Sequence, residues 1–255
     1  MSPTISSKRT QKTGYMTEQS LASGEASVKS PIANPWHTTL VLAVVALNGY
    51  RGVMFAARVR AGFVPDRAQM YLRTMLVEVV ILGIVTFGVW RHGASFDAIF
   101  GERWRKAEQV LRDAGLGLAL WMAALIVVSI LGSVGGHGGD SNQSIGYLLP
   151  RSSRELLLWI CLSVIAGICE EAVFRGYLQR QFSALTRSVP LGIMLSSAAF
   201  GAAHVYQGLP RALVIAASAI FYGVMVEWRG TLRPGMIAHA FQDGIAPMLF
   251  RIARH

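Results

Sequence analysis

Residues 156–178 read LLLWICLSVIAGICEEAVFRGYL, and this stretch decides the fold. Up to Cys169 it carries no charge and is almost entirely apolar. Because a bilayer core takes about 20 apolar residues per helix, the stretch predicts a transmembrane helix. It nevertheless contains Glu170, Glu171 and Arg175. An ionisable side chain costs about 2.5–3.5 kcal/mol at the centre of a membrane helix, so these residues need partners or a function.

Apolar runs recur on both sides of this stretch. We expect further spans over about 37–57, 71–90 and 116–134 before it, and over about 190–205, 212–228 and 235–250 after it. Charged residues make up 15% of the chain, against roughly 25% in soluble domains. The sequence therefore predicts an all-α polytopic membrane protein of about seven transmembrane helices, the last four forming a C-terminal core.

Polar stretches divide the chain into three regions. Residues 1–34 are rich in Ser and Thr and predict a disordered basic tail. We expect residues 35–152 to form an N-terminal transmembrane region of three spans, and residues 153–255 a region of four spans. The charged segment 101–115 is too poor in apolar residues to span, and predicts a short helix at the interface. Residues 135–152 predict a loop.

The formal net charge of +10 indicates lipid contact rather than nucleic acid binding. The basic residues stand at the ends of apolar runs, where they suit anionic headgroups and set topology, and not on one face of the chain. They are more frequent on the side of the N-terminus, which favours a cytoplasmic N-terminus. Cys161 and Cys169 lie about 12 Å apart along one predicted helix, too far for a disulfide.

Helical spacing sorts the polar residues of the predicted spans. Residues four apart share a face, so Glu171 and Arg175 are placed to pair. Glu170 points about 100° away from Glu171 and is left free for chemistry. In the second span, Glu78 is interpreted as snorkelling or pairing locally with Arg73 or Arg91.

Two more polar sites lie on later spans. His239 and Asp243 are four residues apart, so the carboxylate can orient or charge the imidazole, and His204 shares a face with Phe200. Together with Glu170, the two histidines place three proton-handling groups on three helices. Activating a water needs such a set: a base, a second proton handler and a stabiliser of the oxyanion.

Three motifs at these positions resemble those of a known family. Residues 170–178, EEAVFRGYL, resemble the EExxxR motif of the CPBP family, also called the CAAX protease or Abi family. Residues 200–204, FGAAH, resemble its FxxxH motif, and residues 239–243, HAFQD, its HxxxN/D motif. The three occur in the family's order, each on a separate predicted span, and the resemblance covers roughly residues 153–250.

The resemblance implies an intramembrane endopeptidase that hydrolyses a peptide bond in a membrane-borne protein or peptide, in a bacterial inner membrane. It implies that Glu170 and His204 activate the water and that His239 and Asp243 stabilise the oxyanion. Asp243 stands where the members that process prenylated proteins carry Asn. An ionised aspartate would repel an oxyanion, so Asp243 must be protonated or serve to hold His239. The supporting residues are Glu171, Arg175 and Phe200.

Three alternatives stay open at this point. Glu170, His204 and His239 could bind Zn²⁺ as a His₂Glu site, but the sequence has no HExxH motif, and we favour a mechanism without metal or other cofactor. A non-enzymatic immunity or scaffold protein would use the same polar residues for packing. A transporter or proton relay also places acids and histidines in a membrane, but no duplicated halves are present.

Overall fold

A computed structural model describes residues 30–101, 103–134 and 146–252. The predicted all-α fold is confirmed, since the described residues contain helices and no strand. The helices are α2 (Pro35–Arg60), α3 (Arg67–Arg91), α4 (Asp97–Phe100), α5 (Ala107–Val134), α6 (Ser153–Glu171), the π-helix η1 (Ala172–Leu178), α7 (Gln179–Thr186), α8 (Val189–Ala203), the 3₁₀ turn η2 (Val205–Gln207), α9 (Leu209–Arg229) and α10 (Arg233–Ile252).

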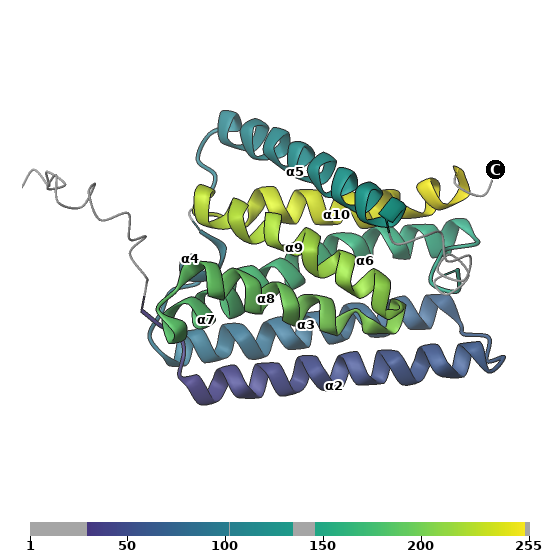
Figure 1. The fold of residues 1–255 in the computed structure, drawn as a ribbon, viewed down its shortest axis with the longest axis horizontal. Coiled ribbons are helices and arrows are strands. Elements are labelled where there is room, and N and C mark those ends of the chain that lie inside the picture. Colours follow the sequence, from purple (N-terminus) through teal and green to yellow (C-terminus); the bar gives the residue numbers. More distant parts are fainter. Residues whose placement is uncertain (1–29, 102, 135–145, 253–255) are drawn as a thin grey trace, which may run out of the picture.

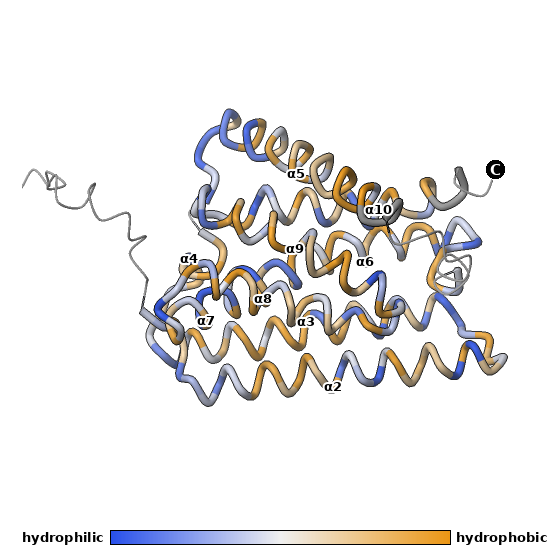
Figure 2. Tube along the Cα trace, viewed as in Figure 1, coloured by the Kyte–Doolittle hydropathy of each residue, from blue (hydrophilic) through white to orange (hydrophobic). Residues whose placement is uncertain are grey.

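The long helices lie side by side, with α2 and α5 at opposite edges of the bundle (Figure 1). Between them, α3 packs on α6, α6 on α10, and α10 on α5, while α8 packs between α7 and α9. Figure 2 shows apolar residues along the helices and hydrophilic residues gathered towards the ends of the bundle. Large apolar side chains such as Leu76, Phe87 and Ile126 are exposed. A surface of this kind suits lipid, and the chain is an integral membrane protein.

Five helical segments are long and apolar enough to cross a bilayer, so the predicted count of seven is not confirmed. They are α2, α3, residues 107–130 of α5, residues 153–186 from α6 through α7, and α9. The helix α8 is apolar but has 15 residues, a length of about 22 Å against a core of about 30 Å. The helix α10 carries His239 and Asp243, whose polarity lowers its hydropathy.

Several predicted boundaries differ from the structure. The segment 101–115 does not form a separate interfacial helix, because residues from Ala107 onwards are the first part of α5. Residues 1–29 of the predicted disordered tail lie outside the described residues, and so do residues 135–145 of the predicted loop. Residues 30–34, which we assigned to the tail, pack against α7 instead. There the backbone N–H groups of Ile32 and Ala33 donate to Gln181 Oε1 at 2.8 and 3.3 Å.

Capping side chains fix where several helices begin. Asn34 Oδ1 accepts from a backbone N–H at the start of α2, where Pro35 opens the helix. Asp66 and Ser152 accept from N–H groups in the first turns of α3 and α6, at 3.1 and 3.2 Å. Each cap satisfies a donor that would otherwise lack a partner, so the polar residues between apolar runs set the register of the bundle.

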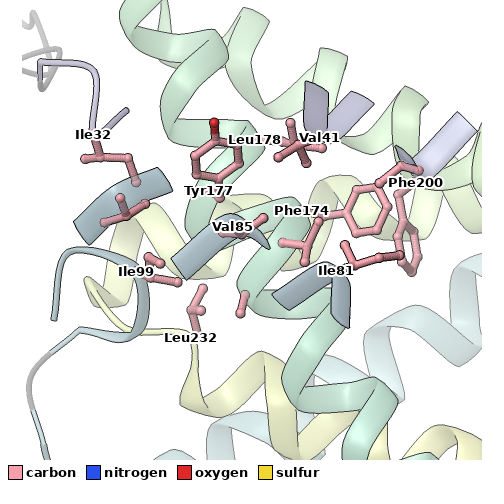
Figure 3. Packing of buried hydrophobic residues seen from close by; sticks show 14 of the residues in the cluster. Ile32, Val41, Ile81, Val85, Ile99, Phe174, Tyr177, Leu178, Phe200 and Leu232 are labelled. Carbon is pink, nitrogen blue, oxygen red and sulfur yellow. The ribbon is translucent and has the colours of Figure 1, made fainter. Parts of the chain in front are cut away.

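The buried core joins η1 to the helices around it (Figure 3). Phe174 and Leu178 of η1 pack in one cluster with Ile81 of α3 and Phe200 of α8. The ring of Phe174 meets that of Phe200 edge-on, with centroids 4.9 Å apart. This cluster places the residues that precede η1 beside the end of α8, which is where the polar side chains converge.

Candidate active site

A π-helix follows directly on the two adjacent glutamates. All seven residues of η1 are buried, and Gly176 lies so close to α4 that a Cβ there would be 2.6 Å from Ile99 Cγ2. The sequence predicted one regular helix to Leu178, and the structure replaces its end by this wider turn. Such turns are rare and recur at functional sites, because they turn the side chains that follow relative to those before.

Glu171 is the buried link between η1 and α10. Its Oε1 accepts from Arg175 Nη1 at 2.9 Å, and also from His239 Nδ1 at 3.0 Å. The Arg175 guanidinium carbon lies 4.2 Å from the centroid of the Phe200 ring, a cation–π contact. The exposed fraction of the side chain is 0% for Glu171 and 2% for Arg175, so this ion pair is sealed from solvent.

Glu170 points at both histidines without touching either. Its Oε2 lies 3.9 Å from His204 Nε2 and 3.6 Å from His239 Nε2. Both distances exceed a direct hydrogen bond, and they match the reach of one bridging water. Glu170 Oε2 is buried and accepts no hydrogen bond from the described residues. This oxygen is therefore a free hydrogen-bond acceptor that lies near both imidazoles.

The tautomer of His204 follows from its backbone contact. Nδ1 lies 2.8 Å from the carbonyl oxygen of Phe200, which can only accept, so Nδ1 carries the hydrogen. In the neutral ring, Nε2 is then an acceptor that faces the Glu170 carboxylate. A molecule placed between the two acceptors has to donate a hydrogen to each, and a water does so.

His239 is oriented by Glu171 and not chiefly by Asp243. Because a carboxylate accepts, Nδ1–H of His239 donates to Glu171, and Nε2 faces the site. Asp243 Oδ2 lies 3.6 Å from the same Nε2, beyond hydrogen-bond distance, and its side chain is 37% exposed. The link from Glu171 to His239 joins two helices 68 residues apart, and helical spacing alone contains no signal for it.

Glu78 is a further acid beside these groups, and its interpretation as a local ion-pair partner is wrong. The residue is buried, and among the described residues its carboxylate makes no hydrogen bond or ion pair. Arg73 donates to Gln69 instead. Glu78 lies within range of direct charge interaction with Glu170 and His239. Its spacing from Ile81 and Val85 on the buried face of α3 was the available signal.

The structure thus brings Glu170, His204, His239 and Asp243 together at the junction of α6, α8 and α10. No group of three His, Cys, Asp or Glu side chains in the described part of the chain is arranged to hold a metal ion. The metal-free site stays a prediction, to be tested by chelation.

Comparison with known families places this junction within one matched region. Residues 152–245 match the family model described as Rce1-like, type II CAAX prenyl endopeptidase. The match contains all four converging residues, whereas Glu78 and α2, α3 and α5 lie outside it. Neither the search of curated proteins nor the search of solved structures returned a match.

Proposed function

Because residues 152–245 match the Rce1-like family model and carry the three motifs that resemble those of the CPBP, or CAAX protease, family, we propose that this membrane protein is an intramembrane endopeptidase that uses a glutamate-activated water. Its substrate is a membrane-borne protein or peptide, and its location is a bacterial inner membrane. One observation carries the proposal. The unpartnered Oε2 of Glu170 lies 3.6–3.9 Å from the Nε2 atoms of His204 and His239. The contacts of the two Nδ1 atoms turn these Nε2 atoms toward Glu170.

The reaction begins with a water that donates to Glu170 and His204. Glu170 takes a proton while the water oxygen attacks the carbonyl carbon of the scissile peptide bond, forming a tetrahedral intermediate. Glu171 holds His239 through Nδ1–H, and in the imidazolium form Nε2–H of His239 donates to the oxyanion. Glu170 then returns its proton to the leaving nitrogen, and the C–N bond breaks to give a carboxylic acid and an amine.

The neighbours of His239 prepare it for this role. The Glu171 carboxylate fixes Nδ1–H, and the buried charge of Arg175 balances Glu171 so that the site does not gain a full negative charge from it. Asp243 lies on the exposed side of the imidazole, so in the protonated form it can donate to the oxyanion, and in the ionised form it holds the imidazolium. The partial exposure of Asp243 also makes its side of the site the natural entrance for a substrate.

A cleavage assay tests the proposal. Purified full-length protein in detergent is incubated with a prenylated peptide and with its unprenylated twin, and products are identified by mass spectrometry. Glu170→Gln should lower kcat/KM by about 10²–10⁴-fold at an unchanged melting temperature, because only the base is removed. Glu108→Gln, an exposed acid in the first turn of α5, is the matched control. Full activity of Glu170→Gln would sink the mechanism, and a wild type that cleaves nothing would favour the scaffold alternative.

Chelation separates the two water-activation schemes. A catalytic zinc takes about three protein ligands, and Glu170, His204 and His239 are the set proposed for it. Binding them all would leave Asp243 as the only nearby proton carrier on the matched region. We therefore expect activity to survive thorough chelation and the purified protein to contain no stoichiometric zinc. Activity that is lost on chelation and restored by zinc would establish the metalloprotease instead.

A further inference from the structure

An arginine-lined pocket lies at one end of the bundle, apart from the candidate active site. Its volume is about 320 Å³, and it opens between the segment that leads into α5 and the turn from α9 to α10. The basic residues in its wall are Arg103, Arg112, Arg229 and Arg233. This is the end of the bundle at which α2 begins and α3 ends (Figure 1). Arg233 precedes His239 by six residues, or about 9 Å along α10.

One buried carboxylate organises the wall of the pocket. Asp113 is 1% exposed, and its Oδ2 accepts from Trp104 Nε1 at 2.8 Å. Its Oδ1 accepts from Arg229 Nη2 at 3.2 Å. The Arg233 guanidinium carbon lies 4.9 Å from the centroid of the Trp104 ring. These contacts join residues 104–113 to residues 229–233, which are more than 100 positions apart, so the pocket is built into the fold. Arg103 and Arg112 are exposed and complete its outer wall.

The positive charge of this pocket exceeds what the protein neutralises. Among the described residues of the wall Asp113 is the one acid, and both of its oxygens are already engaged. Arg103 and Arg233 pair with no carboxylate among the described residues, and Arg229 Nε is buried without a hydrogen-bond partner there. Guanidinium groups bind the oxygens of phosphate and carboxylate in a planar, two-pronged geometry. The ligand that complements the pocket is therefore an anion with several oxygens.

We propose that this pocket binds a phosphate group, presented by an anionic phospholipid headgroup or free in solution. The position favours phosphate because the pocket lies where apolar helices end, at the level of the headgroups. Basic pockets between transmembrane helices bind anionic headgroups at this depth. A bound phosphate would tie the start of α5 to the start of α10, the helix that carries His239 and Asp243.

Ligand-dependent thermal stability tests this proposal without relying on protease activity. The full chain in nonionic detergent is titrated with phosphatidylglycerol, with phosphatidylcholine, and with inorganic phosphate against chloride at equal ionic strength. High salt is used, because screening shortens the reach of exposed charges. We expect the melting temperature to rise with phosphatidylglycerol or phosphate and not with phosphatidylcholine. The double variant Arg103→Gln/Arg233→Gln should bind roughly 30-fold more weakly.

The matched control removes two charges at the same end of the bundle. Arg91 and Arg105 are exposed and lie outside the pocket wall, so Arg91→Gln/Arg105→Gln should bind like the wild type. Arg103→Gln alone serves if the loss of the Arg233 contact with Trp104 impairs folding. A response to phosphatidylglycerol alone identifies a lipid site, and a response to inorganic phosphate identifies a free-phosphate site. No response to either, or equal binding by the pocket and control variants, overturns the proposal.

Discussion

Two adjacent glutamates in one helix meet opposite environments. Glu171 is fully buried, and its Oε1 accepts from Arg175 and His239, while its Oε2 has no hydrogen-bond partner among the described residues. Oε2 of Glu170 has no partner there either, but it faces the two histidine Nε2 atoms of the site. A buried acid that holds an arginine and a histidine serves structure, whereas a buried carboxylate oxygen that faces two imidazoles without a hydrogen bond is available for proton transfer. Substitution by glutamine, which keeps shape and removes charge, separates the two roles.

Glu171→Gln should destabilise the protein strongly. The change leaves the Arg175 guanidinium buried without a counter-charge, which typically costs about 3–5 kcal/mol. It also weakens the hydrogen bond that orients His239, because a neutral amide oxygen accepts less strongly than a carboxylate, so the remaining folded protein should have a reduced kcat. Melting temperature and folded yield in detergent measure the first effect. A Glu171→Gln protein as stable and active as the wild type would show that the ion pair has neither role.

Glu78→Gln should have the opposite effect on stability. A buried carboxylate without a partner costs free energy, so neutralising it should leave the melting temperature unchanged or raise stability by about 1 kcal/mol. Because Glu78 interacts with the charges of Glu170 and His239, kcat should change at the same time. The measurement pairs calorimetry with steady-state kinetics. A marked fall in melting temperature would mean that Glu78 has a stabilising partner in the membrane.

Sequence spacing was informative about residues on one helix and silent about contacts between helices. It placed Glu171 and Arg175 on one face, and those side chains form an ion pair. It assigned the orientation of His239 to Asp243, its neighbour on α10, whereas Glu171 on α6 makes the hydrogen bond. It also treated Glu78 as a local partner, because nothing in the sequence indicates that α3 packs along α6.

The approach of α5 to α10 depends on one glycine. A Cβ at Gly117 would lie 2.9 Å from the carbonyl oxygen of Pro234, at the start of the helix that carries His239. A Cβ at Gly115 would meet nothing within 4 Å, although both glycines belong to α5. The two positions differ in packing and share the same helix propensity.

Gly117→Val should therefore destabilise the protein, by about 1–3 kcal/mol, because the added side chain forces α5 away from α10. Activity should fall as well, since α10 positions His239. Gly115→Val is the control, and its stability should stay within about 0.5 kcal/mol of the wild type. Thermal denaturation of both variants decides the matter. Equal effects at the two positions would show that α5 is not closely packed on α10.

At the level of elements, apolar length predicted which segments are helical, but not how they join. The charged residues of 101–115 suggested a helix on the membrane surface, and the structure continues them into α5. The sequence analysis also predicted a regular helix where the structure has η1, because no residue in AVFRGYL requires a π-turn. We attribute the π-helix to contacts between elements: Gly176 packs against Ile99, and Phe174 packs against Phe200.

At the scale of the whole molecule, the family-matched residues 152–245 are held in place by contacts with the helices that precede them. His37 Nε2–H donates to the Ile84 carbonyl, so its Nδ1 accepts from the Tyr177 hydroxyl of η1, at 2.7 Å. Gln181 of α7 is fully buried, and its amide bonds the backbone of Ile32 and Ala33. The π-helix and the helix after it are thus fixed by residues that lie before α3, over 100 positions earlier.

Residues 146–255 expressed alone should therefore fail to form a stable active site, although they contain every residue proposed to react. Without residues 30–134, the buried amide of Gln181 and the hydroxyl of Tyr177 lose their partners, and each such loss costs about 1–3 kcal/mol. The buried face of α6 would also lose its cover from α3.

Co-expression of residues 1–134 with residues 146–255 should restore the fold, because these contacts do not need a continuous chain. Co-purification of the two pieces and peptide cleavage by the pair measure this. A fragment of residues 146–255 that is as stable and active as the full chain would show that the preceding helices are dispensable. Gln181→Leu in the full chain provides the milder test, since it should lower the melting temperature while leaving both regions present.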